Sequence, residues 1–290
     1  MSSAKKHLHF IINPKSGIQK KSKIVDALKR ELSKEFEYTV TLTKKAEHAT
    51  EIAHEASKNK ANAVIAVGGD GTVNEVGKAL IGTEVALGVI PSGSGNGFAR
   101  HLQIPMQCKA AVQVINTFDI KKIDTASVNG KPFLATAGLG FDAHVGWKFA
   151  DFGRRGFWSY IRVTTNEFFS FKPRQYELII DGKQIETTAF LINFANTGQY
   201  GNNAWIAPSA SVFDGKLNVC ILERFPSRLA PEIVFKLFNK QIEKSNYYRL
   251  IQAKEIWVKK PMEFHMDGEP QESERDLFIK VVPGSLNVIC

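Results

Sequence analysis

The chain has 290 residues, of which 43% are hydrophobic and 23% are charged, and its formal net charge is +9. This length suits one large domain or two ordinary ones. No run of about 18 apolar residues occurs that could form a membrane-spanning helix, so we expect a soluble protein. The three cysteines, Cys108, Cys220 and Cys290, are too far apart in sequence for a disulfide framework or a paired-cysteine metal site, which indicates a reducing compartment. The positive charge favours anionic partners, although a lysine surplus that only aids solubility explains it nearly as well.

The first 125 residues alternate between strand and helix patterns. Apolar, β-branched runs predict strands near residues 8–12, 38–42, 63–67 and 85–90, and the stretches between them predict helices near residues 19–34, 47–59, 73–81 and 106–116. Because strands that alternate with helices form parallel sheets, residues 1–125 are predicted to be an α/β domain with a parallel sheet.

The pattern changes after Asp124. Asn129-Gly130 and Asp181-Gly182 predict hairpin turns between β-rich runs. Further strands are expected at residues 189–194, 217–222, 255–258 and 277–282, and helical interruptions within residues 146–171 and 231–244. We therefore expect a mainly antiparallel β domain over residues 126–290, whose last residues could return to the first domain, and an active-site cleft between the two domains.

The segment that limits the chemistry most strongly is VIAVGGDGTVNEV, residues 64–76. Its glycines allow backbone amides to approach a ligand closely, and Thr72 is expected to open a helix whose N-terminus favours anions. Asp70 would repel a bare phosphate, so its carboxylate fits better beside a metal-bound phosphate or a catalytic proton. The simpler alternative is a tight turn in which Asp70 hydrogen-bonds its own backbone.

Two further loops follow predicted strands in the same way. Residues 91–97 read PSGSGNG, and residues 13–17 read NPKSG. Because the carboxyl ends of parallel strands meet at one edge of a sheet, we expect the three loops to converge on one nucleotide. The glycine loops match neither the P-loop pattern nor the Rossmann fingerprint, since Phe98 stands where the last Rossmann glycine should be.

In the order and spacing of seven elements, the chain resembles the diacylglycerol kinase catalytic domain family of lipid kinases, which includes soluble bacterial diacylglycerol kinases and the related sphingosine and ceramide kinases. The elements are Asn13-Pro14-Lys15-Ser16-Gly17, Thr43, Gly68-Gly69-Asp70-Gly71-Thr72 with Asn74-Glu75, Gly93-Ser94-Gly95-Asn96 with Phe98-Ala99-Arg100, Asp124, Ala207-Pro208 with Asp214-Gly215-Lys216-Leu217, and Asp267-Gly268-Glu269. The resemblance covers nearly the whole chain and implies a fold like that of NAD kinases and diacylglycerol kinases. Asn96-Gly97 departs from the Asn-Asp that bacterial diacylglycerol kinases usually carry, which leaves the acceptor lipid open.

The resemblance implies that the γ-phosphoryl group of ATP passes to a lipid hydroxyl with the help of Mg²⁺, with diacylglycerol as the first acceptor and phosphatidic acid as its product. Asp70 and Asp124 are expected to join in catalysis through metal or nucleotide contacts. A structural Mg²⁺ is implied at Ser211, Asp214 and Lys216, and a β-turn that begins at Asp214 is the alternative. The residues expected to contact the nucleotide are Asn13, Pro14, Lys15, Ser16, Gly17, Thr43, Gly68, Gly69, Asp70, Gly71, Thr72, Asn74, Gly93, Ser94, Gly95 and Asn96.

Asp267 and Glu269 are the candidates for the base that accepts the hydroxyl proton. Gly268 lets the chain turn sharply enough to present both carboxylates, and general bases of this kind are often carboxylates. A β-hairpin turn with two solvated acids is the structural alternative. The residues alone do not choose between the two acids.

Aromatic and basic residues alternate within residues 147–172, where Arg154 and Arg155 lie between glycines. This pattern fits an interfacial element at an anionic membrane, whereas Phe168 and its aromatic neighbours fit a core helix as well or better. We expect a nucleotide and a lipid as ligands, a transient contact with an anionic membrane surface and no nucleic acid. The expected location is the cytoplasm, at the inner face of the membrane, and the sequence leaves a homodimer open.

Two other functions are alternatives to that of a lipid kinase. An NAD kinase would use a soluble acceptor, and the aromatic and basic segment argues against it. A catalytically silent lipid-binding protein would not need the intact acids at Asp70, Asp124, Asp267 and Glu269.

Overall fold

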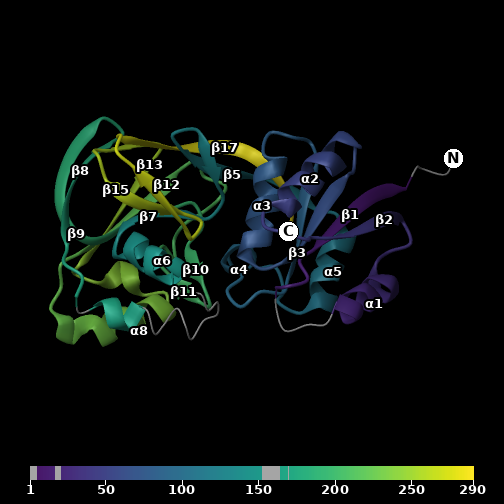
Figure 1. Cartoon of the computed structure of the whole chain (residues 1–290), viewed down its shortest axis with the longest axis horizontal. Coiled ribbons are helices and arrows are strands. Elements are labelled where there is room, and N and C mark those ends of the chain that lie inside the picture. The colour runs from purple at the N-terminus through teal and green to yellow at the C-terminus, as the bar shows by residue number, and fades with distance from the viewer. Residues whose placement is uncertain (1–4, 17–20, 152–163, 169) are drawn as a thin grey trace. The chain divides into compact units, whose positions relative to one another are not determined.

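A computed structural model describes residues 5–16, 21–151, 164–168 and 170–290 of the chain (Figure 1). Its residues form two compact units. Unit 1 comprises Met1–Ile123 together with Gly284–Cys290, and unit 2 comprises Asp124–Pro283. The strands β5 (Ile120–Val128) and β17 (Leu277–Ile289) carry the chain from one unit to the other. Among the described residues, no helix is long and apolar enough to cross a membrane.

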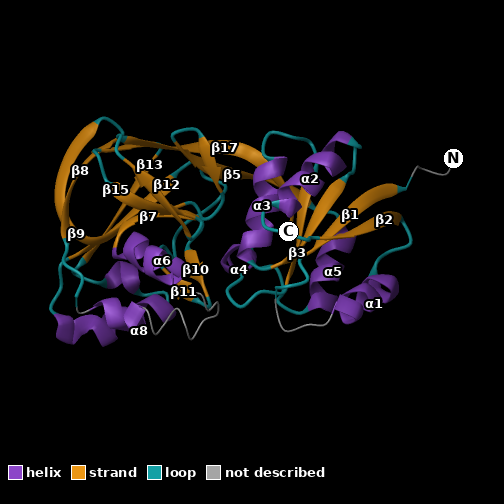
Figure 2. Ribbon diagram, in the orientation of Figure 1, coloured by secondary structure: helices purple, strands orange, loops and turns teal. Residues whose placement is uncertain are grey.

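Unit 1 is an α/β domain in which helices separate parallel strands (Figure 2). Its elements are β1 (Lys6–Ile12), α1 (Lys21–Glu31), β2 (Phe36–Leu42), α2 (His48–Lys58), β3 (Ala63–Gly68), α3 (Asp70–Leu80), β4 (Ala86–Pro91), α4 (Gly97–His101) and α5 (Cys108–Thr117). The strands pair in the order β4-β3-β1-β2, and Val288 at the end of β17 pairs in parallel with Leu87 of β4. Every residue of β3 and β4 is buried, as expected for parallel strands that are covered on both faces.

Helices α1, α2, α3 and α5 lie close to the predicted helices, whereas the short helix α4 is not predicted by the sequence. The start of α3 also differs from the prediction. We expected the helix after β3 to open at Thr72 and to run near residues 73–81, but α3 begins at Asp70, directly after Gly69. Asp70 therefore lies in the first helical turn, where a carboxylate interacts favourably with the helix dipole. The loop between β3 and α3 is therefore shorter than the sequence predicts.

Unit 2 consists mainly of antiparallel strands. Its elements after β5 are β6 (Lys131–Phe133), β7 (Thr136–Gly140), α6 (Phe141–Asp151), β8 (Arg174–Ile180), β9 (Lys183–Ala195), β10 (Gln199–Gly201), β11 (Ala204–Trp205), β12 (Leu217–Glu223), the 3₁₀ turn η1 (Ser227–Leu229), α8 (Ala230–Phe238), the 3₁₀ turn η2 (Ile242–Lys244), β13 (Tyr248–Ala253), β14 (Glu255–Val258), β15 (Met262–Met266), β16 (Glu269–Ser273) and the first part of β17. The two predicted hairpins, at Asn129-Gly130 and Asp181-Gly182, join β5 to β6 and β8 to β9.

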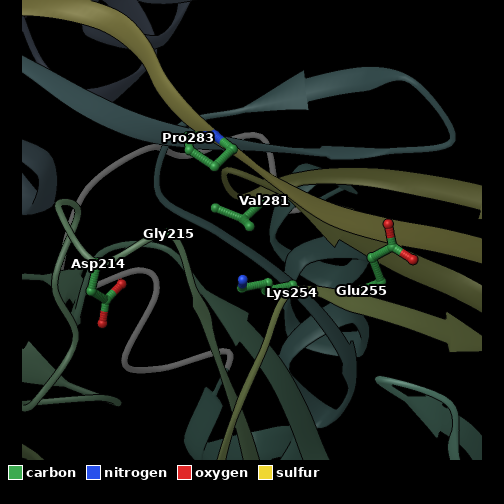
Figure 3. A pocket seen from close by; sticks show the side chains of 6 residues that line it. All are labelled: Asp214, Gly215, Lys254, Glu255, Val281 and Pro283. Carbon is green, nitrogen blue, oxygen red and sulfur yellow. The ribbon is translucent and has the colours of Figure 1, made fainter.

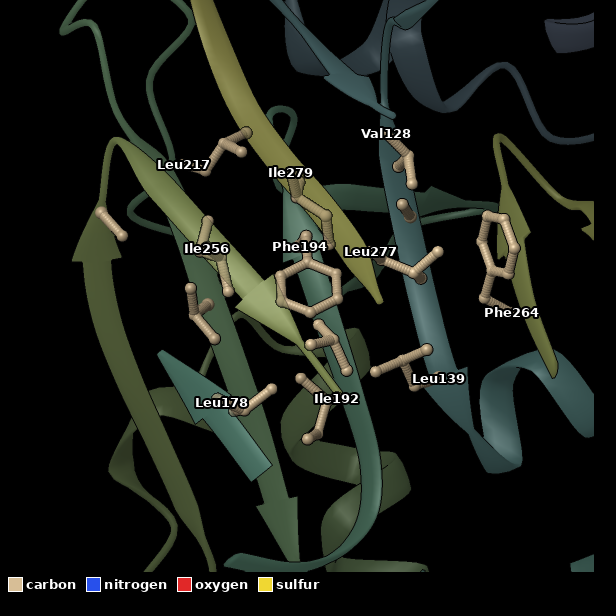
Figure 4. Packing of buried hydrophobic residues seen from close by; sticks show 14 of the residues in the cluster. Val128, Leu139, Leu178, Ile192, Phe194, Leu217, Ile256, Phe264, Leu277 and Ile279 are labelled. Carbon is tan, nitrogen blue, oxygen red and sulfur yellow. The ribbon is translucent and has the colours of Figure 1, made fainter. Parts of the chain in front are cut away.

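The long strand β9 organises the core of unit 2. Its first half pairs with β8, and its second half pairs with β7 on one side and β12 on the other. Ile192 and Phe194 enter the cluster shown in Figure 4, where they meet side chains of β14 and β17. Leu191 and Ala195 point to the opposite face and pack in a second cluster with α6 and α8. This alternation along one strand places apolar layers on both faces of the sheet.

Candidate functional site

The loops of unit 1 follow neighbouring parallel strands and are tied to one another by backbone hydrogen bonds. The N–H of Asn13 donates to the carbonyl of Val67 (3.0 Å), and the N–H of Ser92 donates to the carbonyl of Gly68 (2.8 Å). The buried residue Thr43, after β2, donates its N–H to the last residue of β1 (3.0 Å). The strand ladder thus continues into the loops, which brings the predicted nucleotide-binding segments together at one edge of the sheet.

Two glycines let the loops after β3 and β4 approach each other. A methyl group added at Gly93 would lie 2.5 Å from the Cα atom of Gly69. No real side chain tolerates that distance to backbone, so a glycine at position 93 is needed for the observed packing. The close approach presents two glycine-rich backbone segments side by side, which suits binding of an anionic group by N–H donors.

Side chains hold the first loop against the other two. The Nδ2 group of Asn13 donates to Oγ1 of Thr72 (3.2 Å), and the hydroxyl oxygens of Ser16 and Ser92 are 3.2 Å apart. Lys15 is exposed beside them, with its N–H bonded to Oδ1 of Asn13 (2.9 Å). Pro14 lies in the same loop, and Gly17 lies outside the described residues.

Asp70 does not simply close its own turn. Its Oδ1 accepts the N–H of Phe98 (3.2 Å) in the first turn of α4, so the carboxylate links the starts of α3 and α4. Asn96, with φ of 53°, bridges its own loop by accepting the N–H of Gly93 (3.1 Å) and donating Nδ2 to the carbonyl of the same residue (2.8 Å). The predicted segment from Gly93 to Asn96 is therefore a self-braced loop, in which Ser94 is exposed.

Two residues of α3 differ in their surroundings. The carboxylate of Glu75 accepts the N–H of Ala49 (3.0 Å) in the first turn of α2, a helix-capping role. Asn74 is buried, yet its Oδ1 finds no hydrogen-bond partner among the residues that the structure describes. A buried acceptor without a partner costs about 1–3 kcal/mol, so a donor from a ligand or a bound water would stabilise it.

The acids near the end of the chain lie in unit 2, at the tight turn between β15 and β16. Asp267 and Gly268 have φ of 50° and 81°, the conformation of a two-residue hairpin turn. The Asp267 carboxylate accepts the N–H groups of Leu134 (3.1 Å), Ala135 (2.8 Å) and Thr136 (3.3 Å). Both of its oxygens thus receive hydrogen bonds from the segment at the start of β7, and the acid anchors the turn.

Glu269 differs from Asp267 although only one residue separates them. It is the first residue of β16 and is exposed, and its carboxylate forms no hydrogen bond or ion pair among the described residues. The structure therefore separates the two acids that the sequence left equivalent. Asp267 is held by the fold, and Glu269 is available to solvent or to a ligand.

Behind this turn lies a buried pair of titratable groups that the sequence did not reveal. Nε2 of His265, on β15, is 2.8 Å from Oδ2 of Asp142, on α6. The same carboxylate oxygen accepts hydrogen bonds from Asn193 (2.9 Å) and Tyr200 (3.1 Å). A side chain at Gly138 would collide with both members of the pair, so the missing side chain there makes the room.

The pair connects directly to the turn. The N–H of Gly268 donates to Nδ1 of His265 (3.3 Å) when that nitrogen is unprotonated. Burial lowers the pKa of His265, but the carboxylates of Asp142 and Asp267 together raise it, so the pKa lies above its ordinary value of 6.5. Burial raises the pKa of Asp142, whereas His265, Asn193 and Tyr200 together bring it below its ordinary value of 3.8.

Asp124 is the first residue of unit 2 and is buried. Its Oδ2 accepts the N–H of Gly215 (2.7 Å), and its own N–H donates to the carbonyl of Val212 (2.7 Å). The acid therefore holds the loop that contains Asp214. This position gives Asp124 a definite structural role in addition to any contact with a ligand.

Asp214 lines a surface pocket of about 270 Å³ together with Gly215, Lys254, Glu255, Val281 and Pro283 (Figure 3). Its Oδ1 accepts the N–H of Lys216 (3.0 Å), and Oγ of Ser211 accepts the N–H of Phe213 (3.2 Å). These are contacts of ordinary turns. No group of three or more histidine, cysteine or acidic side chains that could hold a metal occurs in the described part of the chain. The residues thus fit a β-turn better than a metal cage, and the structural Mg²⁺ stays a prediction.

Part of the predicted membrane-binding segment, residues 147–172, is not among the residues that the structure describes. Arg154 and Arg155 lie outside the described residues. Phe168 is described, and its ring packs against Phe141, Phe190 and Phe225, with centroids 5.4–6.1 Å apart. This residue belongs to an aromatic cluster of unit 2.

Comparison with known proteins places these observations in a family. The model of the diacylglycerol kinase catalytic domain matches residues 7–128, and the model of the YegS C-terminal NAD kinase beta sandwich-like domain matches residues 135–290. The chain is 31% identical over 275 residues to a diacylglycerol kinase of Bacillus subtilis, and the match covers 91% of this chain and 90% of that protein. It is 30% identical over 243 residues to the protein named "Probable lipid kinase YegS" of Salmonella arizonae, with 80% of this chain and 79% of that protein covered.

A solved structure agrees in fold. The chain superimposes on a crystal structure of a diacylglycerol kinase from Bacillus anthracis with a TM-score of 0.79 and 23% identity, and the match covers 98% of this chain and 96% of that one. The predicted combination of a parallel-sheet domain and a mostly antiparallel β domain is confirmed. On the evidence of both family models and of relatives that match most of its length, the chain belongs to the diacylglycerol kinase family of lipid kinases.

Proposed function

We propose that this chain transfers the γ-phosphoryl group of ATP to the free hydroxyl of diacylglycerol and thereby forms phosphatidic acid and ADP. The Bacillus subtilis relative, which matches over most of both chains, carries the name diacylglycerol kinase, and this supports diacylglycerol as the acceptor. The relative named for YegS is called only a lipid kinase. A sphingoid base, ceramide or another lipid is therefore the alternative acceptor.

The nucleotide would bind at the loops of unit 1. The close backbone approach of Gly69 and Gly93 offers N–H donors to the phosphates, and the N-terminus of α3 adds its positive dipole end. The unpartnered Oδ1 of Asn74 supports a ligand near this helix. Lys15, exposed on the first loop, would add a positive charge to the same anion site.

Mg²⁺ would arrive with the nucleotide and would neutralise charge on the phosphoryl oxygens. The described residues offer no complete protein cage for it. In kinases, one or two carboxylates commonly share the ion with phosphate oxygens and water. We propose that Asp70 and Asp124 contribute contacts with the metal or with the nucleotide.

The observation that carries the mechanistic proposal is the contrast between the two acids of the hairpin turn. Asp267 is occupied by three backbone donors, whereas the exposed carboxylate of Glu269 contacts no described donor. We assign Glu269 as the base. It would accept the hydroxyl proton of the lipid while the hydroxyl oxygen bonds to the γ-phosphorus and the bond to ADP breaks.

A panel of acceptors tests the proposed reaction. The purified chain is incubated with ATP, Mg²⁺ and, in separate reactions, diacylglycerol, monoacylglycerol, ceramide, a sphingoid base and NAD, and the products are identified by mass spectrometry. We expect phosphatidic acid to form fastest. Faster phosphorylation of another lipid would replace diacylglycerol in the proposal, and phosphorylation of NAD alone would overturn the assignment to lipids.

A further inference from the structure

The helix α8 comprises Ala230–Phe238 (Figure 1). It exposes an apolar face that the proposed active site does not use. Ile233 is buried and Leu237 packs against the second core cluster, so these two residues attach the helix to unit 2. Val234, Phe235 and Phe238 are exposed to 51%, 60% and 42%. At 3.6 residues per turn, these three positions fall within an arc of roughly 100° on the helix surface.

The clustering of these side chains is unusual within this protein. Five other large apolar side chains are exposed in the described chain. Tyr38 and Leu42 lie on β2, and Ile120, Phe213 and Trp257 are far apart in sequence. Single exposed apolar residues are normal in soluble proteins, whereas a contiguous apolar patch marks a surface that binds something. Pro231 is exposed on the same arc and extends the patch.

Basic residues flank α8 in the sequence. The stretch from residue 224 to residue 244 contains five basic residues, Arg224, Arg228, Lys236, Lys240 and Lys244, and only two acidic ones, Glu232 and Glu243. Glu232 is paired with Lys236 (2.7 Å), and Glu243 accepts hydrogen bonds from Ser209. The five basic and two acidic residues leave this stretch with a net charge of +3.

We propose that α8 docks unit 2 onto an anionic lipid surface, with Val234, Phe235 and Phe238 inserted at headgroup depth. A short helix with an aromatic apolar face and flanking basic residues is the pattern of helices that lie in a membrane interface. The basic flank complements anionic headgroups, which a neutral protein partner would not require. The inference rests on the proposed function only in its choice of a lipid surface, since a lipid kinase must reach its acceptor in a bilayer.

Vesicle co-sedimentation without ATP tests the proposal and does not depend on catalysis. Vesicles of phosphatidylcholine are prepared with and without phosphatidylglycerol, and the parent protein is compared with Phe235→Ser and with the double variant Phe235→Ser, Phe238→Ser. Since burial of one phenylalanine is worth a factor of roughly ten to a hundred in affinity, Phe235→Ser should weaken binding to the anionic vesicles by about tenfold or more. Binding should also fall when salt shortens the Debye length from about 10 Å at 0.1 M to about 3 Å at 1 M.

Phe213→Ser is the matched control, because Phe213 is 56% exposed but has no exposed apolar neighbour on a helix. It should bind vesicles like the parent, and none of these variants should change the melting temperature. Equal losses for Phe213→Ser and Phe235→Ser would overturn the proposal, as would unchanged binding by the double variant. A dimer in light scattering that the double variant dissociates would also overturn it and would make α8 an interface between copies.

An activity assay separates this result from the proposed function. Short-chain diacylglycerol in detergent micelles removes the need to dock on a bilayer, so the double variant should phosphorylate it as fast as the parent does. If the parent phosphorylates no lipid in micelles, the proposed function fails while the vesicle experiment still decides the role of α8.

Discussion

At the scale of single residues, Asp267 should act through the shape of the hairpin turn. An asparagine would present an NH₂ group to backbone donors that now find a carboxylate oxygen, and a mismatch of this kind costs about 1–3 kcal/mol. We expect Asp267→Asn to lower both the melting temperature and the turnover number, and to leave the dissociation constant for ATP nearly unchanged. Differential scanning calorimetry and steady-state kinetics measure these quantities. An Asp267→Asn variant that melts like the parent would show that the three hydrogen bonds do not anchor the turn.

The buried pair of Asp142 and His265 predicts a pH dependence of stability. The pKa of Asp142 is lowered in the fold, so its contribution to stability is present above 3.8 and is lost as the pH falls through the lowered pKa. The pKa of His265 is raised, so its contribution is present below 6.5 and is lost as the pH rises through the raised pKa. Above that pKa, His265 keeps the hydrogen bond from Gly268. The pair should therefore stabilise the protein most between 3.8 and 6.5.

Asp142→Asn tests this dependence. Its melting temperature should lie well below that of the parent at about pH 5, and the difference should shrink as the pH rises through the raised pKa of His265. Asp276→Asn is the control, because Asp276 pairs with Lys259 at an exposed site (2.9 Å), where an ion pair contributes little. A difference between Asp142→Asn and the parent that stays constant from acid to alkaline pH would contradict the linkage.

Asp214 tests the predicted structural Mg²⁺. An ion that binds only the folded state raises the melting temperature with its concentration. If the site exists, Asp214→Ala should melt at a lower temperature than the parent and should lose part of the Mg²⁺ dependence. Glu255→Ala is the matched control, since Glu255 lines the same pocket. A parent whose melting curve does not respond to Mg²⁺ would leave the β-turn as the full account of this loop.

At the scale of elements, the packing of the two glycine loops should control nucleotide binding. Gly93→Ala would force the loops after β3 and β4 apart, because the new methyl group would lie 2.5 Å from Gly69 Cα. Overpacking of this kind costs about 1–3 kcal/mol, and if this cost falls on nucleotide binding the dissociation constant for ATP rises by roughly fivefold to 150-fold. Gly71→Ala should have a much smaller effect, since a methyl group there meets nothing within 4 Å. Titration calorimetry with ATP compares the two, and equal effects would contradict the role of the loop packing.

At the scale of the whole molecule, unit 1 was predictable because its signals are local in sequence. Each parallel strand is a continuous apolar run, and each functional loop follows its strand directly, as at Asn13 and Gly68. The sequence predicts the start of α3 too late, because its glycines indicate a loop where Asp70 and Gly71 already have helical geometry. Glycine is permissive enough to occupy either state, so the sequence did not separate them.

Unit 2 was predicted less completely because its pairings are distant in sequence. The turn at Asp267 was recognised as a hairpin alternative, but its anchor is the segment at Leu134, more than a hundred residues earlier. Asp142 and His265 are equally remote from each other and carry no motif in the printed sequence. Such a pair becomes visible only when β15 is aligned with β7, where His265 lies opposite Gly138.

We propose above that Glu269 is the base of an ATP-dependent diacylglycerol kinase. The most direct test is the initial rate of transfer of the labelled γ-phosphoryl group from ATP to diacylglycerol in mixed micelles, measured for the parent and for Glu269→Gln. Removal of a general base typically costs about 10²–10⁴ in rate, so we expect Glu269→Gln to lose at least about a hundredfold in turnover while it melts like the parent and still binds ATP. A Glu269→Gln variant that phosphorylates diacylglycerol at the rate of the parent would contradict this account.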